Sequence, residues 1–201
     1  MPVGAASPIP VCMFDDLLDA CRQNDLERVR SLVTADPTLL LRQSPSGESP
    51  LLAALYARSG ETACWLTGQS WPRSVFEAAA VDDVGRLTDL LVSDPKAADT
   101  YSTDGWSPLH LAAFFGARRA AEFLLARGAD HRLLSRNHMA NTPLHAALAA
   151  KHLPLTELLL EAGADPSTVA AGYTPLAIAE GNGFSAGAAL IRQALAARGG
   201  A

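Results

Sequence analysis

An internal duplication restricts what this chain can fold into more than any other feature of its sequence. Shifting the chain against itself by 58 residues places Asp36-Pro37 on Asp94-Pro95 and Ser49-Pro50-Leu51 on Ser107-Pro108-Leu109. The match continues over about fifty residues at this one offset, and such self-similarity indicates a repeat architecture. The chain is therefore predicted to consist of stacked units rather than to fold around one globular core.

Each duplicated segment contains two smaller units. The apolar residue that follows each turn recurs at intervals of 33, 25, 33, 35 and 32 residues. These six anchor positions are Leu18, Leu51, Phe76, Leu109, Leu144 and Leu176. Within a unit, a short Ala-rich helix is followed by a tight reversal and by a second helix with apolar residues at helical spacing. Because neither helix is long enough to be stable alone, the units must stack to bury their apolar faces.

Three copies of one motif resemble the ankyrin repeat. The first copy reads DGWSPLHLAA at residues 104–113, the second reads TPLHAA at 142–147, and the third reads GYTPLAIA at 172–179. The resemblance covers about residues 14–197 and is strongest in the last three units. It implies an all-α ankyrin-repeat solenoid of about six stacked helix-turn-helix units, the first and last of which act as caps. It also implies binding to another protein.

The residue types around the motif suit the ends of helices. A Ser or Thr precedes a proline at the start of several first helices, at Ser49, Ser107, Thr142 and Thr174. These side chains are expected to cap the helices, and the proline suits the first helical position because an N–H there has no partner inside the helix. Gly128 and Gly163 follow two of the second helices, where a left-handed residue ends the helix.

The predicted domain covers residues 14–198 and follows an N-terminal tail, residues 1–13. Its units are approximately 14–45, 46–71, 72–103, 104–138, 139–170 and 171–198. The 25-residue step predicts a shortened second helix and hairpin around residues 67–72, and therefore an irregular joint. The loop before Thr142 is longer than the one before it and has Ala140 at the usual turn glycine, so it is expected to protrude or to be held less tightly.

Composition and charge exclude several classes of function. The net charge of -5 gives no broad basic footprint for a phosphate backbone, so nucleic acid is not expected as a partner. The three cysteines, Cys12, Cys21 and Cys64, are too few and too irregularly spaced for a disulfide framework or a zinc knuckle. No apolar stretch has the length of a membrane span, and the first residues do not resemble a signal peptide. A cytoplasmic location is predicted.

The sequence offers no catalytic centre. The resemblance implies that His110 and His145, at the same position of two motif copies, are structural and bridge backbone groups of adjacent turns. His131, His138 and His152 lack metal-ligand spacing and are expected in surface loops. Cys21 is expected to be a small core residue, and Cys64 to be more exposed. The chain is therefore predicted not to be an enzyme and to need no cofactor or metal.

Residues that vary between similar units, at positions the family leaves exposed, are the candidates for partner binding. They lie on the predicted hairpin tips and at the ends of the first helices: Trp106, Phe114, Phe115, Tyr173, Tyr56, Asn141, Arg132 and Arg136. Trp and Tyr are enriched in binding hot spots, which favours a row of aromatic residues as a contact surface. The alternative for Phe114 and Phe115 is that they only pack against neighbouring units. Arg132 and Arg136, with His131 and His138, form a basic finger that could steer an acidic partner.

The sequence thus predicts a monomeric, non-catalytic interaction module, an adaptor or inhibitor that binds a partner protein through a concave helix surface and hairpin tips. Two alternatives remain. One is an accessory or metal-handling protein that uses the His-bearing loop at residues 131–138. The other is a structural protein that associates with itself.

Overall fold

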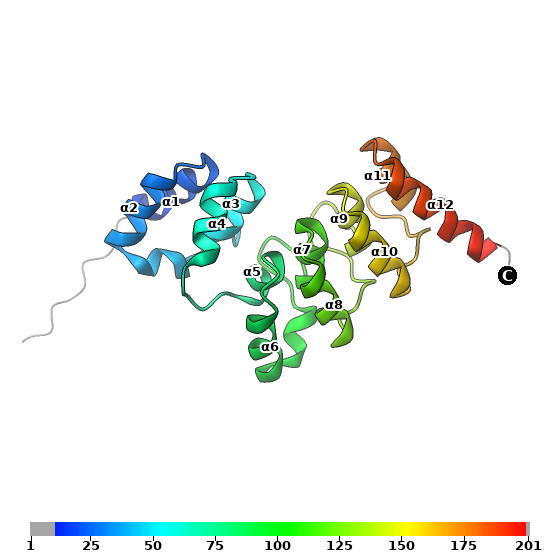
Figure 1. Cartoon of the computed structure of the whole chain (residues 1–201), viewed down its shortest axis with the longest axis horizontal. Coiled ribbons are helices and arrows are strands. Elements are labelled where there is room, and N and C mark those ends of the chain that lie inside the picture. The colour runs from blue at the N-terminus through cyan, green and yellow to red at the C-terminus, as the bar shows by residue number, and fades with distance from the viewer. Residues whose placement is uncertain (1–10, 200–201) are drawn as a thin grey trace, which may run out of the picture. The chain divides into compact units, whose positions relative to one another are not determined.

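The computed structural model describes residues 11–199, and every regular element in this range is a helix. The chain divides into two compact units, Met1–Pro72 and Arg73–Ala201, shown in Figure 1. They are called unit 1 and unit 2 and are described separately. The division falls directly after residues 67–72, where the sequence predicts an irregular joint.

Unit 1 contains two helix pairs. Its elements are α1 (Val11–Arg22), α2 (Leu26–Ala35), the 3₁₀ helix η1 (Pro37–Leu41), α3 (Pro50–Tyr56) and α4 (Gly60–Gly68). The first helix begins inside the stretch assigned above to a tail, while residues 1–10 lie outside the described range. Helix α1 packs against α2 and α3, so the two pairs stack as the repeat pattern requires.

Unit 2 contains four helix pairs arranged in two rows. Its elements are α5 (Val75–Ala80), α6 (Val84–Ser93), the 3₁₀ helix η2 (Pro95–Asp99), α7 (Pro108–Phe115), α8 (Arg118–Ala126), α9 (Pro143–Ala149), α10 (Leu153–Glu161), α11 (Pro175–Gly181) and α12 (Ser185–Gly199). The first helices α5, α7, α9 and α11 lie side by side, and the second helices α6, α8, α10 and α12 form the other row (Figure 1). The predicted helix-turn-helix repeats are therefore confirmed.

The predicted helix starts are confirmed. Ser49, Ser107, Thr142 and Thr174 are the N-cap residues of α3, α7, α9 and α11, and a proline follows each of them. The Ser107 hydroxyl, for example, accepts a hydrogen bond from the His110 amide at 3.4 Å. Helix α5 has no such proline and begins with a capping box between Ser74 and Glu77.

Every helix pair reverses through one residue with a left-handed backbone. These residues are Asn24, Arg58, Asp82, Gly116, Lys151 and Gly183, with φ angles between 57° and 77°. Their regular recurrence supports six repeats across the two units. Only two of the six are glycine, so most turns carry the strain of a side chain in this conformation. At Gly116 a side chain would also collide, since an added Cβ would lie 2.7 Å from the His152 ring.

Two of these turn residues also cap a helix of the next repeat. The Asn24 carboxamide oxygen accepts a hydrogen bond from the Thr62 amide of α4 at 3.1 Å. The Asp82 carboxylate accepts one from the Ala120 amide of α8 at 2.6 Å. Neither α4 nor α8 has a side-chain cap bond from its own N-cap residue. The preceding repeat therefore satisfies an amide that the helix itself leaves unpaired.

The core consists mainly of leucine and alanine side chains. The leucines that are almost completely buried are Leu17, Leu39, Leu51 and Leu66 in unit 1, and Leu87, Leu109, Leu111, Leu124, Leu144, Leu148, Leu155 and Leu159 in unit 2. Buried alanines, such as Ala112 and Ala147, line the first helices and let neighbouring repeats approach closely.

The last repeat has the polar outer face of a cap. Its Glu180 stands where α9 has the buried Leu148, and its Arg192 stands where α10 has Leu160. These two exposed side chains form an ion pair at 2.5 Å. Leu148, by contrast, packs toward Gly187 of the last repeat. In the last repeat, polar residues thus replace the leucines that an inner repeat uses at the two equivalent positions.

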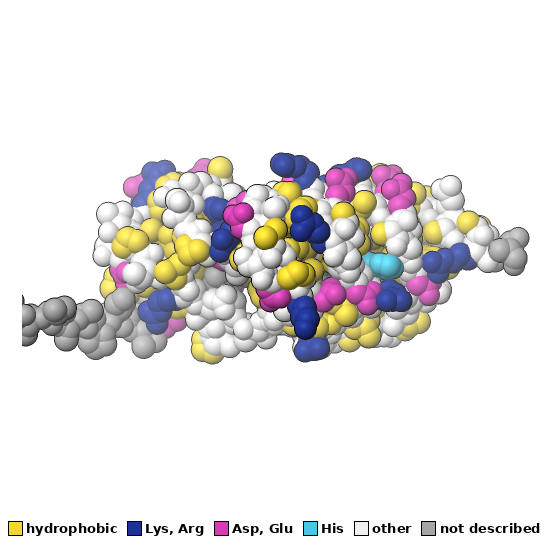
Figure 2. Space-filling model, turned by 90° about the horizontal axis from the view of Figure 1, so that it is seen from below, with side chains coloured by type: hydrophobic (Ala, Val, Ile, Leu, Met, Phe, Trp, Pro, Cys, Tyr) yellow, Lys and Arg dark blue, Asp and Glu magenta, His cyan; other side chains and the backbone are white. Residues whose placement is uncertain are grey.

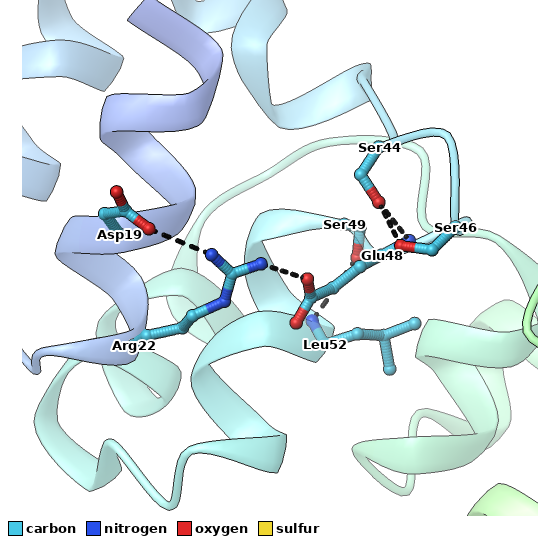
Figure 3. A network of polar contacts seen from close by, with 7 residues as sticks. All are labelled: Asp19, Arg22, Ser44, Ser46, Glu48, Ser49 and Leu52. Carbon is cyan, nitrogen blue, oxygen red and sulfur yellow. Dashed lines mark hydrogen bonds and ion pairs between the residues drawn. The ribbon is translucent and has the colours of Figure 1, made fainter.

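One expectation about the irregular joint is wrong. Helix α4 is not shortened, because it has nine residues, as α8 does. The missing residues come from the hairpin, since α4 leads to α5 without the glycine turn that precedes α3 and α7. In unit 1 the remaining hairpin, residues 44–48, lies beside an ion-pair network formed by Asp19, Arg22 and Glu48 (Figure 3).

Candidate partner-binding surface

Three hairpins, called fingers here, project from the helices of unit 2. Finger A (residues 102–106) is closed by a bond from the Ser102 amide to the Trp106 carbonyl at 2.9 Å. Finger B (residues 135–141) is closed by a bond from the Ser135 amide to the Asn141 carbonyl at 2.8 Å. Finger C (residues 170–173) has a reciprocal pair of bonds between Ala170 and Tyr173, both at 2.9 Å. Each finger ends immediately before a first helix.

Fingers A and B are connected along their backbones. The Arg136 amide donates to the Gly105 carbonyl at 2.8 Å, and the Asn137 side chain donates to the Asp104 carbonyl at 3.0 Å. The two backbones approach so closely that a Cβ on Gly105 would lie 2.6 Å from the Arg136 carbonyl carbon. Gly105 also has a φ of 86°, so both its conformation and its contact require glycine.

The longer finger B is braced from within, contrary to the expectation that this loop is held less tightly. The Asn137 carboxamide oxygen accepts bonds from the Ser135 hydroxyl at 3.0 Å and from the Met139 amide at 3.1 Å. Ala140 adopts a φ of 40° without being glycine. Bonds within the finger therefore hold its backbone in place.

The motif histidines connect each first helix to the following finger, which confirms their predicted structural role. His110 bonds through Nδ1 to the Ser107 hydroxyl at 2.7 Å and through Nε2 to the Asn141 carbonyl at 2.8 Å. His145 repeats this arrangement with the Thr142 hydroxyl at 2.8 Å and the Tyr173 carbonyl at 3.3 Å. A carbonyl oxygen only accepts, so Nε2 carries the proton in both rings.

Burial keeps these two imidazoles neutral. Removal from water lowers the pKa of His110 to about 4, opposed by its bond to the Asn141 carbonyl. The pKa of His145 is also lowered, again mainly by burial. A neutral ring can accept from the hydroxyl at Nδ1 while it donates at Nε2, and this is the pattern that the bridge needs. Neither histidine is exposed to a substrate.

The predicted aromatic residues of unit 2 lie on the fingers and at the end of a first helix. Trp106 is partly buried beside α7, with its ring tilted 52° to the His110 ring at a centroid distance of 5.7 Å. Phe114 and Phe115 meet edge to face at 5.1 Å, and Phe114 is 37% exposed. Tyr173 is 59% exposed at finger C. We call these four residues the inner-helix surface. Three of the four belong to the repeat of α7 and Tyr173 belongs to the repeat of α11, and the repeat of α9 lies between them.

The remaining predicted residues have different surroundings. Tyr56 lies on α3 of unit 1 and is partly buried, so it is not part of the surface in unit 2. Asn141 contributes its backbone to finger B, while its buried Oδ1 has no hydrogen-bond partner. Arg132 is exposed but engaged by Asp130 in an ion pair at 2.9 Å. Arg136 is exposed, and its guanidinium lies 4.0 Å from the centre of the Tyr101 ring.

The sequence analysis missed Tyr101 and three exposed apolar residues, Leu134, Met139 and Val169. Tyr101 also donates from its hydroxyl to the Leu134 carbonyl at 3.1 Å and so links finger A to the segment that leads into finger B. No motif position marks these residues. Only the folded fingers bring Tyr101 beneath Arg136.

The other candidate reactive groups do not form a site. His152 packs against Gly116 at the start of α10, and only His131 and His138 lie in the loop at residues 131–138. Cys21 is buried in the core, as predicted, and burial raises the pKa of its thiol to about 12. Cys64 is exposed, also as predicted. Within residues 11–199, no three His, Cys, Asp or Glu side chains gather in a way that could hold a metal ion.

No helix within residues 11–199 has both the length and the apolar character to cross a membrane.

Comparison with known proteins identifies the family. Residues 75–170 match the family model for ankyrin repeats, with three copies. The chain is 33% identical over 126 residues to the nuclear factor NF-kappa-B p105 subunit of Gallus gallus, covering 60% of this chain and 13% of that protein. It is 32% identical over 139 residues to the Notch protein of Drosophila melanogaster, covering 68% of this chain and 5% of that protein.

A third relative has a more similar length. The probable 26S proteasome regulatory subunit p28 of Saccharomyces cerevisiae is 29% identical over 195 residues, covering 85% of this chain and 81% of that protein. The family match, the motif copies and the stacked helix pairs agree, and the chain is an ankyrin-repeat protein. Ankyrin repeats are protein–protein interaction modules.

Proposed function

We propose that this chain is a non-catalytic adaptor or inhibitor that binds a partner protein through the inner-helix surface and the fingers of unit 2. Tyr56 would provide a separate contact on unit 1. The chain would act as a monomer in the cytoplasm. The names of the relatives support a regulatory role, since p28 is described as a regulatory subunit of the proteasome. Because the chain spans only 13% of p105 and 5% of Notch, their whole-protein functions do not carry over.

One observation carries the proposal: exposed aromatic side chains lie on or near the first helices, two of which carry no charged residue. Helices α7 and α9 contain no Asp, Glu, Lys or Arg. Phe114 is nevertheless exposed at the end of α7, and Tyr173 is exposed on finger C, just before α11. The interior of a protein interface is depleted in charge and enriched in aromatic residues, which matches this composition. Stacked repeats and braced fingers would limit the entropy lost on binding.

The metal-handling alternative depends on the loop at residues 131–138, which contains His131 and His138 but neither buried motif histidine. His110 and His145 use both ring nitrogens in hydrogen bonds inside the fold, so neither has a lone pair available for a metal. Titration with zinc tests the remaining histidines. Self-association, the second alternative, is tested by size-exclusion chromatography over a dilution series, where a constant elution volume supports the monomer.

Affinity capture from the native source tests the proposal directly. The full chain and the double variant Trp106→Ala/Phe114→Ala are used as baits, and captured proteins are quantified by mass spectrometry. We expect at least one protein to be captured by the wild type and to be reduced at least about tenfold with the double variant, since two hot-spot truncations typically cost more than about 1.4 kcal/mol.

A matched control replaces Arg119, an exposed residue of α8 outside the inner-helix surface, with Ala. This bait should capture the same proteins as the wild type. Thermal melts of all baits show whether the variants are folded. Capture that is unchanged by the double variant would contradict this location of the binding surface.

A further inference from the structure

In the fingers of unit 2 and the segments beside them, four carboxylates already have hydrogen-bond or ion-pair partners, whereas one arginine has no carboxylate partner. Asp130 pairs with Arg132, and Asp165 pairs with Arg198 at 2.6 Å. Asp104 accepts from the Ser102 hydroxyl at 2.5 Å. Asp99, just before finger A, accepts from the Asp130 amide at 2.9 Å. Each of these carboxylates is therefore already bonded within the chain.

Arg136 of finger B has no carboxylate within ion-pair distance in the described part of the chain. Its guanidinium stacks on the Tyr101 ring at 4.0 Å, while Tyr101 is fixed by its own bond to the Leu134 carbonyl. Stacking uses the face of a guanidinium and leaves its N–H donors in the plane free to bind a carboxylate with two bonds. The arginine is held in place before any ligand arrives, which lowers the entropy cost of pairing.

Exposed apolar side chains lie on the same finger as this arginine and on finger C. Seven large apolar residues are exposed in the described range, and four of them lie on finger B, finger C or the segments leading into them. These four are Leu134, Met139, Val169 and Tyr173, each between 45% and 61% exposed. The His145 bond to the Tyr173 carbonyl ties α9, the helix that follows finger B, to finger C. Leu134 and Met139 lie within three residues of Arg136 in the sequence, and exposed apolar surface of this kind is typical of a binding site.

We propose that fingers B and C bind an acidic segment of the partner protein, in which an Asp or Glu pairs with Arg136 and neighbouring apolar residues pack on Leu134, Met139 and Tyr173. This inference rests on the proposed function and specifies the chemistry of its partner. It also revises the expected basic finger. Arg132 is neutralised by Asp130, so the attraction comes from one oriented arginine rather than from a diffuse cluster.

Charge distribution favours a protein segment over a nucleic acid or a lipid surface. Phosphate backbones and anionic membranes are bound by several clustered Lys and Arg side chains. The space-filling view instead shows basic and acidic side chains interspersed on the face it displays (Figure 2). The whole chain has a net charge of -5. A single arginine among apolar residues suits a carboxylate within an apolar sequence, where the two kinds of contact act together.

Selection from a displayed library of random peptides tests this proposal with the full chain as bait. We expect selected peptides to be enriched in Asp or Glu next to Leu, Phe or Trp, and to bind more weakly as the salt concentration rises. Arg136→Gln should weaken their binding about tenfold to a hundredfold, because a hydrogen-bonded charge pair contributes about 1.5–3 kcal/mol. Arg136→Lys should give an intermediate loss, since lysine keeps the charge without the bidentate geometry.

Arg119→Gln is the matched control, because it removes an exposed arginine from α8 and should leave peptide binding unchanged. Circular dichroism melts check that Arg136→Gln is folded, and Met139→Ser provides a second test on finger B that leaves the arginine intact. A loss of binding is expected for Met139→Ser as well.

The possible failures are distinguishable. This inference would be overturned by selected peptides that lack acidic residues, or by peptides that bind Arg136→Gln as well as the wild type. If those peptides still bind Trp106→Ala/Phe114→Ala more weakly than the wild type, the proposed function would stand. If no peptide is selected and native-source capture also fails, both proposals are overturned. Co-sedimentation with vesicles of anionic phospholipid that depends on Arg136 would assign the fingers to a membrane and would also overturn the inference.

Discussion

The hairpin of unit 1, residues 44–48, is called the unit 1 finger. It and finger A of unit 2 occupy equivalent positions in the duplicated sequence, but the unit 1 finger bonds to the repeat before it and finger A bonds to the repeat after it. In unit 1, Glu48 forms an ion pair with Arg22 of the preceding repeat (Figure 3). In unit 2, the equivalents of these two residues are Trp106 and Ala80, so the pair is absent there. Finger A instead bonds to the repeat that follows it, through Gly105 and through the nearby His110.

A substitution on the first helix accompanies the missing hairpin between α4 and α5 in this difference. Leu52 of α3 stands where α7 has His110, and it is buried as an ordinary core residue. Leucine has no ring nitrogen, so α3 has no bridge of the kind that connects α7 to finger B. What both copies keep is the cap supplied by the turn residue, Asn24 in unit 1 and Asp82 in unit 2. The duplication thus retained the contacts that define helix ends and changed the contacts that hold the fingers.

The contact between fingers A and B should give the largest effect when it is broken. We expect Gly105→Ala to lower the free energy of unfolding by about 2–5 kcal/mol, of which about 1–2 kcal/mol comes from the left-handed backbone and about 1–3 kcal/mol from the collision with Arg136. Urea unfolding followed by circular dichroism measures the change.

Gly172→Ala is the matched control. It stands at the same turn position in finger C, with a φ of 84°, but its added Cβ would meet no atom within 4 Å. It should therefore cost only the conformational part, about 1–2 kcal/mol. Equal losses for the two variants would show that fingers A and B are not in close contact in solution.

Replacing His110 by its unit 1 counterpart should give an intermediate effect that depends on pH. At neutral pH we expect His110→Leu to cost about 1–3 kcal/mol, because the Ser107 hydroxyl and the Asn141 carbonyl lose their partner. The folded pKa of His110 is about 4, below its ordinary value of 6.5. Between these values the unfolded chain binds the extra proton, so the wild type loses up to about 3 kcal/mol as the pH falls from 6.5 to 4.

The variant lacks this titrating group, so its stability should fall less over the same range. The difference between wild type and variant should therefore shrink on acidification, as measured by urea unfolding at a series of pH values. His138→Gln, at an exposed site in finger B, controls for the removal of an imidazole as such. Parallel stability curves for the wild type and His110→Leu would mean that the imidazole is not buried in a neutral state.

These contrasts also show which features a sequence can reveal. The helix pairs and their N-caps were predictable because each depends on residue type at a fixed local spacing. The bridging role of His110 and His145 followed instead from the resemblance to the ankyrin repeat, because each bridge reaches a carbonyl about thirty residues away. The internal ties of finger B were not, since Asn137 bonds to groups whose positions follow from an irregular backbone with Ala140 at positive φ. The stacking of Arg136 on Tyr101 requires two fingers to be placed beside each other, and nothing in either segment alone encodes it.

The same limit explains the mixed outcome for the candidate surface. The sequence placed Trp106 and Tyr173 on hairpins and Phe114 and Phe115 at the end of a first helix, and the structure agrees. It treated Arg132 and Arg136 as equivalent, however. Their difference lies in local geometry, because Asp130 is placed to engage Arg132 at 2.9 Å. The binding role of these residues stays a prediction until a partner is measured.

The ion pair that holds the unit 1 finger should have the smallest effect. Arg22 is 44% exposed and Glu48 is 21% exposed, so water screens much of their attraction. A double-mutant cycle with Arg22→Ala and Glu48→Ala should give a coupling free energy of about 0–1 kcal/mol that decreases with added salt. Glu48→Ala alone should cost little, because Arg22 keeps its pairing with Asp19 at 2.9 Å. A coupling above about 2 kcal/mol, insensitive to salt, would mean that the pair is shielded from solvent and that the unit 1 finger is fixed as firmly as finger A.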